Sequence, residues 1–324
     1  MKSKTPFASI AIVMVGALSA QSTAPQQKMF DTPDQAASAL IKAAEAYDVA
    51  ALLELFGPDG KDLISSGDDV RDRNYISAFA ANAKVKTSVS IHPKNSARAI
   101  LSIGTLGWPF PVPMVRQNGK WRFDSKSGIR EILYRRIGSN ELDAIQVCRG
   151  FVEAQKEFAS LARDYTGTAQ YAQRIISSPG KKDGLYWQDA DGKPGGPISE
   201  VIAKAIEEGY APSASSGYHG YYFKVLKGQG PAAPMGQLDY VINGIMIGGF
   251  ALMAVPAEYG VSGVKTFIVS HDGIVYEKDL GPESLATAKT VERYNPDKSW
   301  QRTDDEWPAE NGTSPDGAAG IPRQ

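Results

Sequence analysis

The feature of this sequence that most constrains its fold is a change in hydrophobic period that occurs twice. Between residues 33 and 56, apolar side chains recur every three or four positions, as they do along one face of a helix. From Val85 they alternate with polar residues, which is typical of a half-buried strand. A second helical stretch, over residues 140–165, is again followed by alternating segments. The sequence therefore predicts an α+β fold in which each half packs helix on antiparallel sheet.

Length and composition agree with two globular domains. The chain has 324 residues, about twice the length of a typical domain. Hydrophobic residues make up 42% of it and charged residues 22%, which excludes a disordered or fibrous protein. The 35 basic and 36 acidic residues give a net charge of -1, so we expect no nucleic-acid partner. The single Cys148 excludes a disulfide within the chain.

Residues 1–20 have the pattern of a secretory signal peptide. Lys2 and Lys4 precede an uncharged run over residues 7–20, and the small residues Ser19 and Ala20 suit cleavage after either of them. The run is shorter than the ~20 apolar residues of a membrane span, and an uncleaved anchor is the alternative. We therefore expect a periplasmic or secreted protein with no membrane span once the signal is removed.

A later uncharged stretch, residues 240–257, is close to the lower length limit for a spanning helix. Glycines at 244, 248 and 249 interrupt it, and Pro256 lies near its end. Ile, Val and Phe dominate its apolar positions, which favours buried strands over a membrane helix.

The first predicted domain covers residues 21–138 and places helices before a meander of strands. Thr32 and Pro33 are the residue types found at a helix start, and Gly57-Pro58 ends the helical pattern. Asn118-Gly119 lies between two short strands, which is a strong hairpin signal. This order of elements resembles the cone-shaped nuclear-transport-factor-2-like fold. The resemblance implies a pocket inside the cone, used for ligand binding or by an acid/base pair.

Four side chains in this half are candidates for lining such a pocket and contacting a small ligand. They are Trp108, Arg116, Trp121 and Tyr134. The alternative is that they are ordinary core and rim residues of the sheet.

The second predicted domain covers residues 139–282. Asn140 is placed as the cap of a helix that runs to about Tyr165 and carries two adjacent rows of apolar residues, a wide buried stripe. Cys148 lies on that stripe, so we expect an inert core thiol and not a nucleophile. A short helix over residues 199–208 and a hairpin at Asp272-Gly273 are also predicted.

Several segments of this half are similar to the globular heads of type IV pilins and type II secretion pseudopilins. They are Ala154-Gln155 within the long helix, residues 183–186, Gly217-Tyr218 and residues 254–263. The polar residues 140–143 depart from that pattern, because a pilin helix begins with a hydrophobic assembly segment. This departure argues against filament formation.

Over nearly the whole mature chain the sequence is identified as a member of a bacterial exported family, catalogued as domain of unknown function 2950. The residues that carry this resemblance are 63–68, 108–113, 183–187 and 259–263. The resemblance implies no established activity.

One loop has part of the spacing of a calcium site. Asp189, Asp191 and Glu200 fall at positions one, three and twelve of a calcium-binding loop. Lys193 stands where an oxygen ligand belongs and Pro194 where glycine is required, so a plain Gly/Pro turn is the alternative. No other cofactor is predicted.

The three histidines give no recognisable catalytic or metal motif. His92 and His271 fall in turns, and His219 stands among tyrosines, where strand surface is the favoured interpretation and a general base the alternative. The sequence contains no nucleophile elbow, zinc-protease motif or phosphate-binding loop.

These observations predict an exported, non-catalytic protein that acts in envelope interaction or assembly, with an envelope protein or a small ligand as its partner. The alternative is a small-molecule-binding protein or hydrolase that uses a pocket in the first domain. Residues 283–324 are polar and rich in Gly and Pro, and we expect them to form a loose tail.

Overall fold

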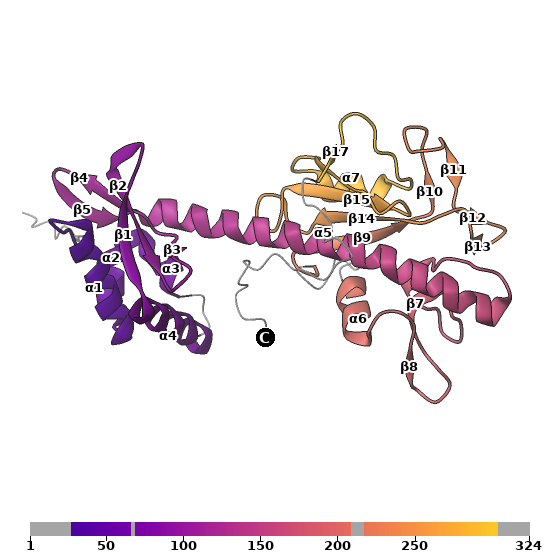
Figure 1. Cartoon of the computed structure of the whole chain (residues 1–324), viewed down its shortest axis with the longest axis horizontal. Coiled ribbons are helices and arrows are strands. Elements are labelled where there is room, and N and C mark those ends of the chain that lie inside the picture. Colours follow the sequence, from indigo (N-terminus) through magenta and orange to yellow (C-terminus); the bar gives the residue numbers. More distant parts are fainter. Residues whose placement is uncertain (1–26, 66–68, 209–216, 304–324) are drawn as a thin grey trace, which may run out of the picture. The chain divides into compact units, whose positions relative to one another are not determined.

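The fold was analysed in a computed structural model, which describes residues 27–65, 69–208 and 217–303. The chain divides into two compact units, Met1–Ile132 and Leu133–Gln324, each described here by itself (Figure 1). The predicted signal peptide, residues 66–68 and the end of the predicted tail from residue 304 lie outside the described residues.

The helices of the first unit precede its sheet, as predicted. Thr32 caps the first of them, since its hydroxyl accepts a hydrogen bond from the Gln35 amide at 3.2 Å. The single helix expected up to Gly57 is wrong, because Tyr47 adopts a left-handed conformation (φ 49°) and Asp48 caps a new helix. The helices are α1 (Pro33–Glu45), α2 (Val49–Phe56), α3 (Lys61–Ile64) and α4 (Asp69–Val85), with a 3-10 turn at Pro58–Gly60.

The first sheet is an antiparallel meander in the order β1-β2-β4-β5, and β3 pairs with the end of β2 on the same edge as β4. Asn118 and Gly119 both have positive φ (52° and 79°) and close the predicted hairpin as a type I′ turn. The strands are β1 (Thr87–His92), β2 (Asn95–Ile103), β3 (Trp108–Pro109), β4 (Met114–Gln117) and β5 (Lys120–Phe123).

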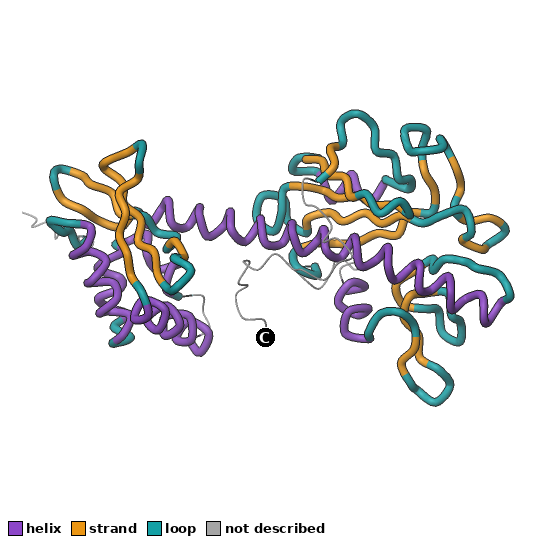
Figure 2. Tube along the Cα trace, viewed as in Figure 1, coloured by secondary structure: helices purple, strands orange, loops and turns teal. Residues whose placement is uncertain are grey.

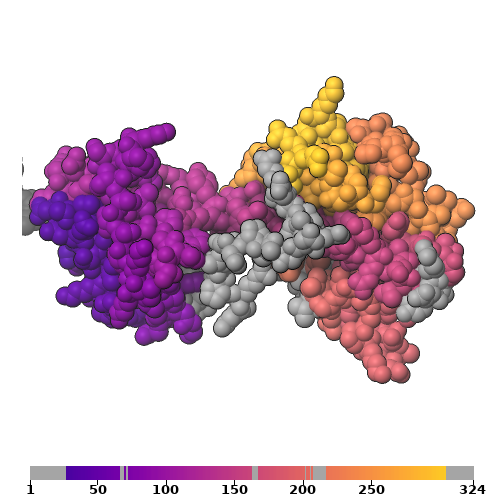
Figure 3. All heavy atoms as spheres, in the orientation of Figure 1, coloured from indigo at the N-terminus to yellow at the C-terminus, as the bar shows by residue number. Residues whose placement is uncertain are grey.

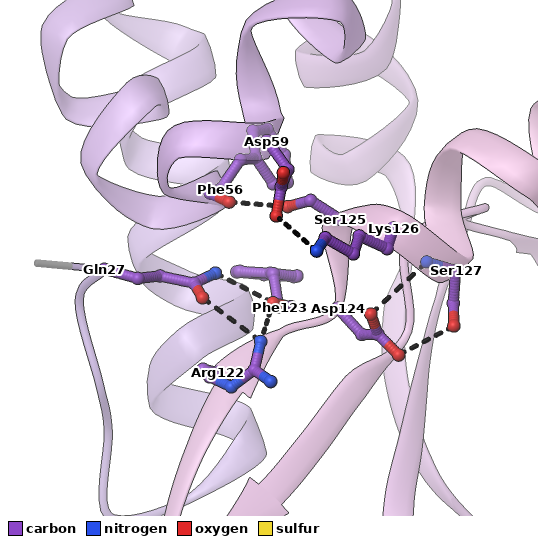
Figure 4. Close-up of polar contacts among 9 residues, drawn as sticks. All are labelled: Gln27, Phe56, Asp59, Arg122, Phe123, Asp124, Ser125, Lys126 and Ser127. Carbon is purple, nitrogen blue, oxygen red and sulfur yellow. Dashed lines mark hydrogen bonds and ion pairs between the residues drawn. The ribbon is translucent and has the colours of Figure 1, made fainter. Parts of the chain in front are cut away.

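One helix, α5 (Ser125–Thr166), runs for 42 residues and takes part in both units. The predicted start at Asn140 is therefore wrong. The helix begins directly after β5, where the Asp124 carboxylate accepts hydrogen bonds from the amide and hydroxyl of Ser127 (Figure 4). The Ser125 hydroxyl also donates to the Phe56 carbonyl at 2.6 Å, which ties this first turn to α2.

The second unit contains a sheet of five strands in the order β17-β16-β15-β14-β9. The sheet lies along one side of α5, and α6 lies on the other side with β7 (Figures 1 and 2). The predicted hairpin joins β15 to β16. The elements of this unit are β6 (Arg174–Ile176), β7 (Gly184–Gln188), β8 (Pro194–Gly195), α6 (Glu200–Glu208), β9 (Tyr221–Leu226), β10 (Gly228–Gln229), β11 (Leu238–Asp239), β12 (Val241–Ile242), β13 (Ile245–Met246), β14 (Ala251–Pro256), β15 (Lys265–Ser270), β16 (Val275–Asp279), α7 (Ser284–Thr290) and β17 (Gln301–Arg302).

Helices and antiparallel sheets in both units confirm the predicted α+β class. The uncharged stretch 240–257 forms strands, and β14 is buried along its whole length between β9 and β15. In the described part of the chain, no helix combines the length and the apolar character that crossing a membrane requires.

The apolar stripe of α5 is the base of the second core. Cys148 is fully buried on it, and burial raises the pKa of its thiol to about 12, against the smaller opposite effect of the Arg149 charge. The thiol is therefore protonated at neutral pH, as expected of an inert core residue. The stripe packs its rings edge-to-face against the rest of the unit, Phe151 on Phe250 and Phe158 on Trp187.

The predicted loose tail does not hold for residues 284–302. This segment forms α7 and then β17, which pairs with β16. Tyr294 within it is fully buried in the second core. The Lys224 ammonium donates to the carbonyls of Ala288, Lys289 and Val291, so it satisfies the carbonyl end of α7.

A buried amide fixes the chain that follows α5. The Gln155 side chain is completely buried, and its oxygen accepts from the Ala172 amide while its nitrogen donates to the Ala172 carbonyl, both at 2.8 Å. Ala172 is itself fully buried, so no water replaces these bonds.

Replacing Gln155 by leucine should lower the free energy of unfolding by about 2–4 kcal/mol, because two buried backbone groups lose their partners. Urea denaturation measures the loss. Gln146→Leu on the exposed side of the same helix is the matched control and should change stability by less than about 0.5 kcal/mol. Equal effects of the two substitutions would contradict the assigned role of Gln155.

Candidate binding groove

The second unit has a groove of about 450 Å³ between α5 and α6, here called the α5–α6 groove. Its α5 side runs from Asp143 to Glu157, about 21 Å along the helix axis. Figure 3 shows this part of the second unit, with the magenta atoms of α5 next to the salmon-coloured atoms of the segment that contains α6. The groove has the size of a ligand or peptide site.

The floor of the groove is apolar. It combines side chains from the two helices with others from the strands beneath them, and several are half-exposed and so available to a ligand. The apolar lining residues are Val147, Phe151, Ala154, Ile175, Leu185, Pro197, Ile198, Ile202, Ile206 and Leu252.

The rim of the groove is acidic. Asp143, Glu153 and Glu157 lie along α5, and none of the described residues that line the groove is lysine or arginine. Glu153 forms an ion pair with Lys156 on the next turn at 2.9 Å, whereas the side chain of Glu157 is exposed. The groove thus presents carboxylates around an apolar floor.

One end of the groove is closed by a histidine–carboxylate pair. His219 Nδ1 lies 2.9 Å from the Asp143 carboxylate, and its ring packs edge-to-face on Tyr218. His219 and Gly220 both have positive φ (49° and 74°) in a tight turn closed by two backbone bonds between Tyr218 and Tyr221. His219 therefore lies in a turn and not on a strand surface, with the positive φ that this kind of turn requires.

The polar residues at the start of the predicted helix are anchors to the sheet. The Asn140 amide donates to the Ser262 carbonyl at 2.8 Å, and the Glu141 carboxylate accepts from the amides of Val264 and Lys265. The sequence alone indicated a helix cap at Asn140 and a departure from a pilin helix over residues 140–143, but not these contacts. Every second-unit loop that they contact lies more than 70 residues away, so local sequence carries no signal of these contacts.

The four candidate ligand residues lie on four different elements, β3, β4, β5 and α5. Arg116 and Trp121 are cross-strand neighbours, with the guanidinium 5.8 Å from the ring centroid, and Trp121 is buried. Trp108 is exposed on β3, and Tyr134 is exposed on α5. None of the four lines a pocket identified in the first unit.

The first unit contains a different depression, here called the aromatic pocket, of about 170 Å³ between α4, α2 and the segment around Phe110. The Phe110 ring stacks on Phe56 and tilts against Phe79, with centroids 6.3 and 5.1 Å apart. Its described lining residues include no carboxylate and no histidine.

Two of the three candidate calcium ligands come near one another. Asp189 and Glu200 line a polar pocket beside β7, but Asp191 is not among its lining residues. Asp189 is paired with Lys182 and Glu200 with Lys204. Within the described ranges, no three His, Cys, Asp or Glu side chains gather as a metal ion would require. The calcium site stays a prediction.

A family model described as "Protein of unknown function (DUF2950)" matches residues 27–303. The chain therefore belongs to this family. Searches of curated proteins and of solved structures found no match.

Proposed function

We propose that this protein is exported and non-catalytic, and that it acts in the cell envelope by binding a basic, amphipathic segment of a partner protein in the α5–α6 groove. The observation that carries the proposal is the combination of an apolar floor with an acidic rim that contains no lysine or arginine. Apolar side chains of the partner would supply affinity, and its basic side chains would supply orientation and association rate.

One feature of the sequence and one feature of the fold support the envelope location. The first 20 residues have the composition of a signal peptide. A long helix packed on an antiparallel sheet also supports the proposed likeness of the second unit to pilin and pseudopilin heads. Similarly, helices followed by a meander support the proposed likeness of the first unit to the nuclear-transport-factor-2-like fold.

Binding of a synthetic helical peptide tests the groove. The peptide carries leucines at one helix face and lysines beside them, and a second peptide has every lysine replaced by glutamate. Fluorescence anisotropy should show binding of the lysine peptide alone. Glu157→Lys should weaken it by about fivefold, because an attractive rim charge becomes repulsive.

Glu54→Lys is the matched control, since Glu54 is exposed on α2 of the first unit, away from the groove. It should leave the affinity unchanged. The proposal would be overturned by equal binding of both peptides, or by an equal effect of the two charge reversals.

The alternative, a small-molecule-binding protein, has one supporting observation, the aromatic pocket of the first unit. Its apolar lining favours an apolar ligand over the acid/base chemistry of a hydrolase.

Binding of the neutral dye N-phenyl-1-naphthylamine tests this alternative. The dye should gain fluorescence with the protein, and Ile76→Trp, which fills the pocket, should remove most of that gain. Val85→Trp, at an exposed position, is the control. No gain with the wild-type protein would exclude this function.

A further inference from the structure

A second pocket of the second unit, here called the β7 pocket, has a different chemistry from the groove. It has a volume of about 470 Å³ and lies between the end of β7, the turn at residues 178–181 and the first turns of α6. Its polar lining includes Lys181, Gln188, Asp189, Glu200 and Lys204.

The charged residues that line the β7 pocket are two lysines and two carboxylates, Lys181, Lys204, Asp189 and Glu200. The Glu200 carboxylate lies 2.5 Å from the Lys204 ammonium, and the Asp189 carboxylate lies 3.2 Å from the ammonium of Lys182, which is outside the lining. The bond and charge of Lys204, followed by the Tyr186 hydroxyl, lower the pKa of Glu200, so this carboxyl is ionised at neutral pH. Because the lining contains equal numbers of acidic and basic side chains, it has no net charge of its own to attract an ion.

The paired groups still offer many hydrogen bonds. Each carboxylate has lone pairs left over after one ion pair, and each ammonium has further N–H groups. Lys181 and Gln188 are exposed and add donors and an acceptor. Closely spaced donors and acceptors without net charge complement vicinal hydroxyl groups, and bonds to the ionised groups are the stronger kind.

The walls of the β7 pocket are held in place before a ligand arrives. The Asp183 carboxylate accepts from the amide and hydroxyl of Ser178 at 2.7 and 2.8 Å, which fixes the start of the turn. On the other side, the Tyr186 ring is buried, and its hydroxyl is next to Glu200 without a hydrogen bond of ordinary geometry. The buried Tyr186 hydroxyl is therefore available to form a hydrogen bond with a ligand in the pocket.

We infer that the β7 pocket binds a neutral carbohydrate, with Glu200, Asp189 and Lys181 as the residues that hydrogen-bond its hydroxyl groups. The site is separate from the α5–α6 groove and shares no lining residue with it. The inference therefore stands or falls independently of the proposed partner segment.

Titration of the ¹⁵N-labelled full chain with chitotetraose and with maltotetraose tests the inference. At least one of the two should shift the amide signals of Lys181 and Gln188, with a Kd at or below ~10 mM. Glu200→Gln should weaken binding about tenfold, because a charged acceptor becomes a neutral one. Lys181→Met should also weaken it, and this exposed position lies outside the helices and strands, so folding is not at risk.

Glu153→Gln in the α5–α6 groove is the matched control and should leave sugar binding unchanged. The inference is overturned if neither sugar shifts these signals, if inorganic phosphate shifts them more strongly, or if both pocket variants bind as the wild-type protein does. Peptide binding to the groove, measured in parallel, reports on the proposed function alone.

Discussion

The packing of one face of α5 on the sheet is the interaction on which the second unit depends. Eight α5 residues from Ala144 to Ala162 belong to its buried core, next to β9, β14 and β15. Each large apolar side chain buried there contributes about 1.5–3 kcal/mol. Among the described elements, none places more residues in this cluster than α5. Polar contacts then fix the position of the helix along the sheet, at Asn140 and Glu141 on one end and at Gln155 further along.

This position of α5 also creates the groove. The face of α5 next to its buried stripe lies between the sheet and α6. Val147 and Ala154 of α5 line the groove there together with Ile202 of α6. Since α6 begins at a cap formed by Ser199 and carries Glu200 and Lys204 on its other side, the same short helix borders both the groove and the β7 pocket. The two sites differ in charge because α5 supplies carboxylates to one, whereas lysines accompany the carboxylates of the other.

The sequence alone predicted the elements better than their connections. Sequence patterns predicted α6 and the alternating strands, and Asn118-Gly119 predicted a hairpin, since these signals are local. The start of α5 was missed although Ile129, Leu133 and Ile137 recur every four residues and Asp124 was available as a cap. The groove was not predictable, because Asp143 and His219 meet only through tertiary packing. A ligand site at Trp108, Arg116, Trp121 and Tyr134 stays a prediction.

The most direct test of the account is photo-crosslinking in cells from position 202. A photoreactive amino acid replaces Ile202 in the groove, and in a second protein it replaces Ile245 on β13, with matching exposures of 42% and 41%. The account predicts a crosslink from position 202 alone, to a protein segment in which basic residues flank an apolar face. Crosslinks of equal yield from both positions, or a crosslinked segment without basic residues, would contradict it.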